Sequence, residues 1–172
     1  KTAQANACSR ISRAVKLVFP SAVHVIGGQH ITLFYEDYLR DNPDFEYGFL
    51  GEADLNFAEF CARIQRRQPV DDIPCIAYRR DGRVVGTERE LITALDELPR
   101  PNFDVIEGFS WADFRYPLLT SRGCPYKCNF CSVWKFHEST FREKSPERVV
   151  AELRTIEAPN VFITDDIFWM NV

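Results

Sequence analysis

The order of the predicted elements indicates an α/β protein made of two packing units. In residues 3–67, helix, strand, helix, strand and helix follow one another, which is the order of a doubly wound sheet. Residues 116–164 read as a strand, a cysteine-rich loop, a helix and a second strand. That order is the opening βαβ unit of a (β/α) barrel. A stretch with prolines and a hairpin signal separates the two patterns, so we expect two α/β units joined by a connector.

The composition is that of a globular protein, and it argues against nucleic-acid binding and against a membrane-spanning segment. The chain has 172 residues, of which 45% are hydrophobic and 27% charged, which suits one domain or two small ones. Its 21 basic and 25 acidic residues give a net charge of −4, which argues against nucleic-acid binding. No apolar run approaches the ~20 residues of a transmembrane helix, and no signal-peptide pattern begins the sequence. Six cysteines in such a chain suit a reducing cytoplasm.

The first unit opens with a helical pattern over residues 3–18. Ile11, Val15 and Val18 recur on one face of this helix, which predicts that the face is buried. Residues 22–26 follow as a continuous apolar run, which is typical of a buried parallel strand. Two glycines end that strand and allow a tight turn or the close approach of a ligand.

A second strand and two further helices complete this unit. Residues 31–39 read as a helix that ends before an Asp-Asn-Pro sequence. Residues 45–50 are predicted to form a strand, and Asp54 is expected to be the N-cap of a helix that runs to about residue 67.

The connector is predicted over residues 69–115. Asp81 and Gly82 lie between two short apolar runs, which is a strong signal for a β-hairpin. Prolines at 99 and 101 mark an extended segment that leads to the second unit.

The second unit is predicted to begin with a strand at residues 116–121. Ser145 and Pro146 form an N-cap followed by a proline at the first helical position, so a helix is expected over residues 146–157. A second strand is expected at residues 160–164. The helix is expected to face the core with its apolar residues, Val149, Val150 and Leu153.

The loop between the first strand and this helix carries Cys124, Cys128 and Cys131 in the spacing C-x3-C-x2-C. Gly123 precedes them and allows the backbone to turn sharply beside a bulky ligand. Three thiolates can hold three irons of a cubane iron–sulfur cluster, whereas complete protein ligation takes four cysteines. The spacing therefore predicts a cluster with one iron open to a small molecule.

Other uses of the cysteines remain open from the residues alone. His137 could complete a Cys3His zinc site, although zinc sites usually show paired C-x2-C units or matched histidines. Disulfides do not account for three cysteines in one loop, because an odd number cannot all pair. The other cysteines lie in apolar contexts and are predicted to be packing residues: Cys8, Cys61 and Cys75.

The segment from Cys124 to Cys131 closely resembles the cluster loop of radical S-adenosylmethionine (SAM) enzymes. In that family the open iron chelates the amino and carboxylate groups of SAM, and an electron from the cluster cleaves SAM to a 5′-deoxyadenosyl radical. The resemblance implies that Phe130 lies beside the adenine. It also implies that Asp165 and Asp166, just beyond the second strand, approach the amino group of SAM. The alternative for this acidic pair is a helix cap and a solvated turn.

Two loops of the first unit resemble the later half of the Rossmann-like cobalamin-binding domain that precedes many radical SAM modules. In such domains the loops at the carboxyl ends of the strands embrace the nucleotide tail of the corrin. The matching positions are Gly27, Gly28, Gly51 and Glu52. The cobalt-ligand motif of the family would lie in an earlier half of the domain, so His24 and His30 are not predicted to bind cobalt. We expect a core position for His24 and a hydrogen-bonded loop position for His30.

The resemblance implies a fragment of a cobalamin-associated radical SAM enzyme, incomplete at both ends and inactive in isolation. It divides the chain into a partial cobalamin-binding domain (1–68), a connector (69–115) and the start of a radical SAM barrel (116–172). Implied cofactors are a 4Fe–4S cluster, SAM and cobalamin, and the implied reaction is methyl transfer to an unactivated carbon. Implied partners are a small-molecule or lipid substrate, with a hopanoid-type subgroup suggested, and a flavodoxin or ferredoxin as electron donor. The alternatives are radical ring closure without methyl transfer and a non-catalytic zinc- or cluster-binding module.

Overall fold

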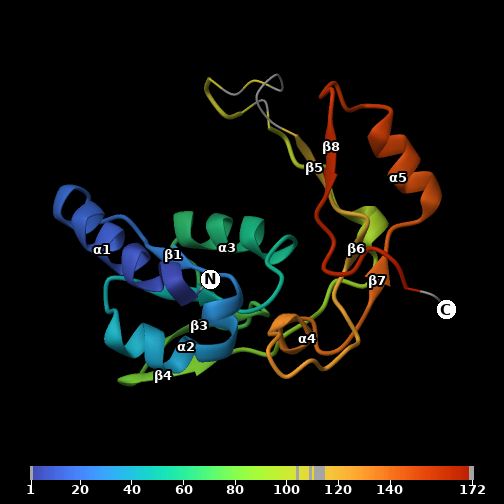
Figure 1. Cartoon of the computed structure of the whole chain (residues 1–172). Coiled ribbons are helices and arrows are strands. Elements are labelled where there is room, and N and C mark those ends of the chain that lie inside the picture. Colours follow the sequence, from blue (N-terminus) through green and yellow to red (C-terminus); the bar gives the residue numbers. More distant parts are fainter. Residues whose placement is uncertain (1, 104, 109, 111–114, 171–172) are drawn as a thin grey trace. The chain divides into compact units, whose positions relative to one another are not determined.

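The computed structural model describes residues 2–103, 105–108, 110 and 115–170. The chain forms two compact units, Lys1–Leu91 and Ile92–Val172, and each is described by itself (Figure 1). Each unit combines helices with strands, so the predicted α/β class is confirmed. The predicted domain limits at residues 68 and 115 stay a prediction.

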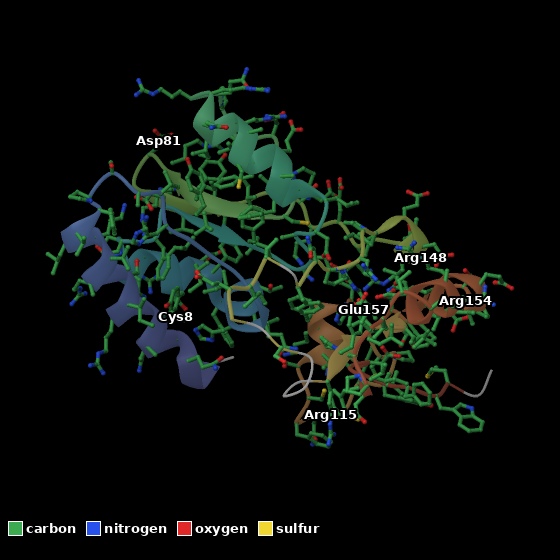
Figure 2. All side chains as sticks on the ribbon, turned by 90° about the horizontal axis from the view of Figure 1, so that it is seen from above. Cys8, Asp81, Arg115, Arg148, Arg154 and Glu157 are labelled. Atoms are coloured by element: carbon green, nitrogen blue, oxygen red, sulfur yellow. The ribbon has the colours of Figure 1, made fainter. Side chains whose placement is uncertain are left out.

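The first unit is a four-stranded mixed sheet in the order β1-β2-β3-β4. Strands β1 and β2 are parallel, whereas β2–β3 and β3–β4 are antiparallel. The hairpin that the sequence places in the connector thus supplies half of this sheet, with Asp81 at its turn (Figure 2). The elements are α1 (Thr2–Val18), β1 (Val25–Ile26), α2 (Gln29–Asp41), β2 (Tyr47–Phe49), α3 (Asn56–Gln65), β3 (Ile76–Arg80) and β4 (Arg83–Gly86).

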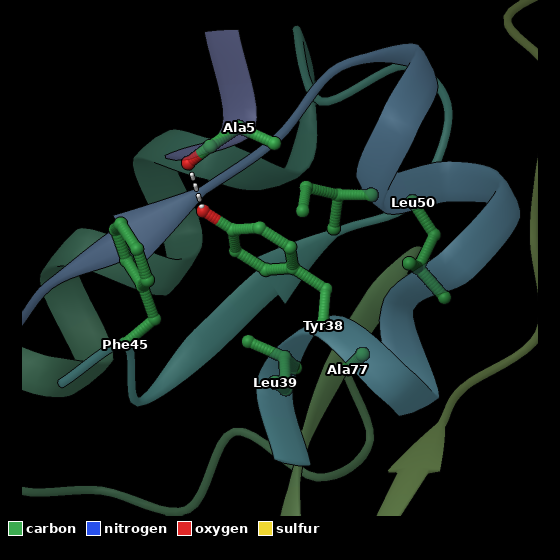
Figure 3. Packing of buried hydrophobic residues seen from close by; sticks show 7 residues of the cluster. Ala5, Tyr38, Leu39, Phe45, Leu50 and Ala77 are labelled. Carbon is green, nitrogen blue, oxygen red and sulfur yellow. Dashed lines mark hydrogen bonds between the residues drawn. The ribbon is translucent and has the colours of Figure 1, made fainter. Parts of the chain in front are cut away.

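Helices cover both faces of this sheet. Successive residues of a strand point to opposite faces, so that one strand can pack against a helix on each side. On β3, Ile76 packs in a cluster with Phe60 of α3, whereas Ala77 packs with Leu39 of α2. The α2 side also receives α1, through a hydrogen bond of 2.8 Å from the Tyr38 hydroxyl to the Ala5 carbonyl (Figure 3). Two apolar layers therefore hold the sheet, as a doubly covered α/β unit requires.

Two details of the first unit differ from the sequence-based predictions. Helix α3 begins at Asn56, with Leu55 at the N-cap position, so the prediction of Asp54 as the N-cap was wrong. The predicted inner face of α1 is largely open, with Ile11 63% and Val18 68% exposed. The helix exists as predicted, but its apolar stripe does not mark a buried face in this unit.

The second unit contains the predicted βαβ arrangement. Strands β5 and β8 are parallel, with Leu118 opposite Ile163, and α5 lies between them in sequence. The N-cap is confirmed, because Ser145 Oγ accepts the Arg148 amide at 3.1 Å and a proline opens the helix. The elements are η1 (Leu95–Glu97), β5 (Tyr116–Leu118), β6 (Ser121–Arg122), α4 (Val133–Phe136), β7 (Arg142–Glu143), α5 (Pro146–Leu153) and β8 (Val161–Ile163).

Helix α5 is held by a buried polar cluster rather than by the predicted apolar face. Val150 and Leu153 are 45% and 41% exposed. Glu152 is buried instead, where it accepts hydrogen bonds from Lys144 Nζ at 2.7 Å and from the Tyr116 hydroxyl at 3.1 Å. Burial, together with the nearby Glu152 carboxylate, raises the pKa of Tyr116 to about 12. We call these three residues, Tyr116, Lys144 and Glu152, the Glu152 cluster.

Candidate functional site

The cysteine loop is closed at its base by backbone pairing. Strand β6 leads into the loop and pairs antiparallel with β7, which leads out of it. Beside this pair, the Lys144 amide donates to the Thr120 carbonyl at 2.8 Å. The loop is therefore fixed at both ends directly beyond the carboxyl end of β5, which is the end where barrel enzymes place their chemistry.

Gly123 is required at the entrance of this loop for two separate reasons. Its φ of +89° lies in the left-handed region, which favours glycine. A Cβ atom there would also lie 2.4 Å from the Thr140 carbonyl oxygen and 2.9 Å from the Cβ of His137. The sequence argument for a sharp turn at Gly123 is confirmed, and the structure adds the steric reason.

The three cysteines of the loop are free thiols. Cys124 and Cys131 are partly buried and Cys128 is exposed. The Cys128 carbonyl accepts both the Cys131 amide and the indole N–H of Trp134, each at 3.1 Å, so that the second half of the loop forms a turn. Among the described residues, no three Cys, His, Asp or Glu side chains are grouped as a metal site. The donor set still fits an iron–sulfur cluster, because three accessible thiols lie within eight consecutive residues.

Aromatic side chains of the same loop face solvent. Phe130 is 89% exposed and Tyr126 is 59% exposed. An exposed ring beside a cluster loop is available to stack on a planar ligand. That Phe130 lies beside an adenine stays a prediction.

His137 is buried behind the loop and is engaged on both sides of its ring. Its Nε2 lies 3.2 Å from Asp166 Oδ2, and its Nδ1 lies 2.9 Å from Arg142 Nη2. A zinc ligand must offer one of these nitrogens to the metal. In this arrangement His137 is therefore not free to complete a Cys3His site with the loop cysteines.

Asp165 and Asp166 both bind the backbone that leads into the cysteine loop. Asp165 Oδ1 accepts the amides of Thr120 at 2.7 Å and Ser121 at 3.1 Å, while its Oδ2 accepts the Thr120 hydroxyl. Asp166 Oδ2 accepts the Gly123 amide at 3.1 Å. The hydrogen bond with His137, and then that with Gly123, hold the pKa of Asp166 below its usual value in spite of burial. The predicted contact of these carboxylates with SAM stays a prediction.

The two glycine loops of the first unit lie at the same edge of the sheet, because β1 and β2 are parallel. Gly27 and Gly28 follow β1, whereas Gly51 and Glu52 follow β2. Thr32 of α2 joins the two loops: its hydroxyl donates to the Gly28 carbonyl at 3.0 Å and accepts the Gly51 amide at 2.8 Å. Sequence reasoning missed Thr32, whose only signal is a threonine in the first turn of a helix that follows a Gly-Gly turn.

The glycines of these loops differ in what they require. Gly28 has a φ of +93°, and no atom lies within 4 Å of a Cβ added there, so its requirement is conformational. Gly51 has a φ of +77°, and a Cβ there would lie 3.4 Å from Nε of Arg89. Glu52 is 6% exposed. The predicted role of all four positions in cobalamin binding stays a prediction.

The histidines of the first unit are partly buried. His24 Nδ1 lies 2.6 Å from the Ser12 hydroxyl, and its amide donates to Glu46 Oε2 at 2.7 Å. His30 lies in the first turn of α2, with its ring 5.3 Å from that of Phe34, so the prediction of a loop position was wrong.

Two of the three cysteines outside the loop pack as predicted. Cys75 is fully buried, and burial raises the pKa of its thiol. Cys8 packs against the core from a partly buried position, but Cys61 is exposed, so the packing prediction was wrong for it.

No helix in the described part of the chain has the length and apolar character needed to cross a bilayer.

No protein-family model matches the chain, but curated proteins do. An uncharacterized methyltransferase of Pyrococcus horikoshii is 28% identical over 94% of this chain and 37% of its own length. An anaerobic magnesium-protoporphyrin IX monomethyl ester cyclase of Rubrivivax gelatinosus is 30% identical over 86% of the chain and 28% of its own. The hopanoid C-3 methylase of Methylococcus capsulatus is 26% identical over 91% and 31%. The chain thus spans about a third of the length of these relatives.

Solved structures share the fold. The radical SAM methyltransferase TsrM of Kitasatospora setae, with cobalamin and a [4Fe–4S] cluster bound, superposes with a TM-score of 0.74 at 15% identity, covering 95% of this chain and 34% of its own. The cobalamin-dependent SAM radical enzyme OxsB, with aqua-cobalamin and SAM bound, gives a TM-score of 0.75 at 19% identity, covering 95% and 24%. Both comparisons extend across the two units.

Proposed function

Because the chain belongs to the family of cobalamin-dependent radical SAM enzymes, we propose that it carries the cluster loop and part of the corrin site of a carbon methyltransferase. The observation that supports this most is the cysteine loop, which carries three free thiols and whose preceding backbone, at Thr120 and Gly123, is held by the carboxylates that follow β8. The substrate, a small molecule or a lipid, and the electron donor belong to the proposal as well.

In this proposal Cys124, Cys128 and Cys131 hold a 4Fe–4S cluster and leave one iron for SAM. When bound, the cluster would supply the electron for the reductive cleavage of SAM, and cobalamin would carry the methyl group. The protein residues orient these groups. Phe130 offers an aromatic face to the adenine, and Asp165 and Asp166 hold the strand end from which the ligand loop starts.

The first unit carries the proposed corrin-binding positions. Gly28 and Gly51 have backbone conformations that side chains rarely adopt, and Thr32 fixes the spacing between their loops. Two loops held together at the carboxyl edge of parallel strands form the usual ligand site of an open α/β sheet. We assign the nucleotide tail of cobalamin to this edge, at Gly27, Gly28, Gly51 and Glu52.

A second candidate is radical ring closure without methyl transfer, which the similarity to the magnesium-protoporphyrin cyclase favours. The two reactions share the cluster and SAM cleavage, and they differ in the product. With SAM labelled in its methyl group, a methyltransferase transfers the label to the product, whereas a cyclase gives an unlabelled product and 5′-deoxyadenosine.

Anaerobic reconstitution tests the cluster assignment. The parent chain should bind about four irons with matching sulfide, and each of Cys124→Ala, Cys128→Ala and Cys131→Ala should lose the cluster. Cys61→Ala is the matched control, because it removes an exposed free thiol outside the loop. Zinc in place of iron, or a triple variant of the loop cysteines that keeps the same iron, would overturn the proposal and favour the structural-module reading.

A further inference from the structure

We propose that Asp166 and His137 form a positioning pair that fixes the amide of Gly123, the residue directly before the first cysteine of the loop. The pair acts through the acceptor oxygen of Asp166, not through contact of its charge with SAM. This inference rests on the proposed function, because it concerns the loop assigned to the cluster.

One carboxylate oxygen carries both contacts of the pair. Asp166 Oδ2 accepts the Gly123 amide at 3.1 Å and lies 3.2 Å from His137 Nε2. The His137 side chain is 9% exposed and that of Asp166 is 27% exposed, so water competes weakly for these bonds. A single oxygen thus joins the β8 end of the unit to the residue that aims Cys124.

The tautomer of His137 follows from its other neighbour. The Arg142 guanidinium can only donate hydrogen bonds, so His137 Nδ1, 2.9 Å from its Nη2, is the acceptor. The proton of the neutral ring is then on Nε2, where it points to Asp166. Arg142 is itself fixed by donating from Nη1 to the Ile92 carbonyl at 2.6 Å. Donation therefore runs from Arg142 to His137 and from His137 to Asp166 Oδ2, and the same oxygen accepts the Gly123 amide from the other side.

Packing and hydrogen bonding converge on the same residue. His137 Cβ lies so close to Gly123 that an added Cβ would be 2.9 Å away. The left-handed turn at Gly123 is thus held by its amide on one side and by the His137 side chain on the other. Groups that orient metal ligands from behind commonly change metal affinity or activity by about 10–100-fold when they are replaced.

Asp165 accepts hydrogen bonds from a different part of the same backbone. Its two oxygens accept the Thr120 hydroxyl and the amides of Thr120 and Ser121. Adjacent carboxylates therefore hold adjacent stretches, Asp165 the end of β5 and Asp166 the turn into the loop. These contacts support the inference that both carboxylates position the backbone that leads into the cysteine loop.

Four variants separate an acceptor role from a charge role. Asp166→Asn keeps one oxygen that can accept both hydrogen bonds, removes the charge and places an amide NH2 where the other carboxylate oxygen was. Asp166→Ala removes the acceptor, and His137→Phe keeps a ring of similar size without the Nε2–H donor. Glu147→Gln is the control, because it removes one carboxylate charge from the exposed first turn of α5 in the same unit.

Amide hydrogen exchange of Gly123 in the metal-free chain reads the proposed bond directly. Asp166→Ala should speed this exchange about tenfold, the equivalent of one hydrogen bond, and His137→Phe should speed it by a smaller factor. Asp166→Asn and Glu147→Gln should leave it near the parent value. Unchanged exchange in Asp166→Ala, or equal acceleration in Asp166→Asn, would overturn the pair; if Asp166→Ala fails to fold, unchanged exchange in His137→Phe overturns it.

The reconstituted chain supplies the second readout. Iron affinity should fall by about 10–100-fold in Asp166→Ala, while Asp166→Asn should keep both the iron and the change that SAM causes in the electron paramagnetic resonance of the reduced cluster. Loss of that change in Asp166→Asn with iron retained would show that the charge contacts SAM, against the proposal. A parent chain that binds no cluster would sink the proposed function, and the exchange experiment would still decide whether the pair exists.

Discussion

The two units of the chain are stabilised by different means. In the first, apolar residues fill both sides of the sheet, and Leu39, Ile76 and Ala77 are fully buried. In the second, the three residues of β8 are each more than a third exposed, while Glu152, His137 and Ser121 are among the most buried side chains. The two hydrophobic clusters of the described residues lie in the first unit, whereas the second combines a few buried apolar residues, such as Leu95 and Leu118, with buried polar contacts.

This contrast indicates how accurately each unit must position the loops that it carries. Apolar packing is non-directional and tolerates small shifts, which is sufficient for a scaffold that presents two glycine loops. Hydrogen bonds to a carboxylate fix direction as well as distance. In the second unit such bonds converge on Thr120, Ser121 and Gly123, the residues that lead to the cysteines. These contacts therefore orient the cysteine loop, while the Glu152 cluster holds α5.

The largest effect is expected from breaking the Glu152 cluster. Glu152→Ala leaves Lys144 buried and charged without its partner, so we expect a loss of about 3–5 kcal/mol in the free energy of unfolding, measured by urea denaturation. Replacing all three members, as Tyr116→Phe, Lys144→Met and Glu152→Leu, should restore stability to near the parent value. If the triple replacement is as unstable as Glu152→Ala, the cluster is not the feature that holds α5.

The second-largest loss of stability is expected from a hydrophobic substitution in the first unit. Leu39→Ala empties a fully buried site on α2 and should cost about 2–5 kcal/mol. Ile163→Ala in β8, where the side chain is 38% exposed, is the matched comparison and should cost less than about 1.5 kcal/mol. Equal losses at the two sites would contradict the distinction between the units.

Thr32 tests whether a polar contact has the same importance in the first unit. Thr32→Val keeps the shape but leaves the Gly51 amide and the Gly28 carbonyl without their bridge, so stability should fall by about 1–3 kcal/mol. Thr32→Ser keeps the hydroxyl and should recover most of this loss. If Thr32→Val lowers cobalamin affinity while Thr32→Ser restores it, the Thr32 bridge also shapes the proposed corrin site. If Thr32→Val is as stable as the parent, the bridge does not stabilise the first unit.

Sequence reasoning predicted what depends on local signals. The Ser145–Pro146 helix start, the Asp81–Gly82 hairpin and the turn at Gly123 were each confirmed, because cap, turn and left-handed positions restrict residue type strongly. The cysteine spacing was readable for the same reason, since ligands of one cluster must lie close together in the loop.

Contacts between distant segments were not readable. Nothing near Glu152 in the sequence indicates that Tyr116, 36 residues away, donates to its carboxylate. The apolar neighbours Val150 and Leu153 therefore predict an inner face that the structure does not have. Asp54 has the residue type of an N-cap, but the chain enters α3 one residue later. The Asp165–Asp166 pair was placed correctly at the end of a strand, whereas its contacts with Thr120 and Gly123 needed the fold.

The smallest effect is a pH dependence that isolates Asp166. Its pKa is lowered from 3.8, first by the hydrogen bond from His137 and also by the Gly123 amide. A carboxyl whose folded pKa lies below its unfolded value contributes stability that is present above the unfolded value and lost as pH falls through the folded one. The free energy of unfolding should therefore decrease below about pH 4 more steeply in the parent than in Asp166→Asn.

Both proteins share every other titrating group, so their difference, measured by urea denaturation at successive pH values, reports this carboxyl. Parallel curves for the parent and Asp166→Asn would show that Asp166 is not held ionised by His137. The polar organisation of the second unit would then rest on Asp165 and the Glu152 cluster alone.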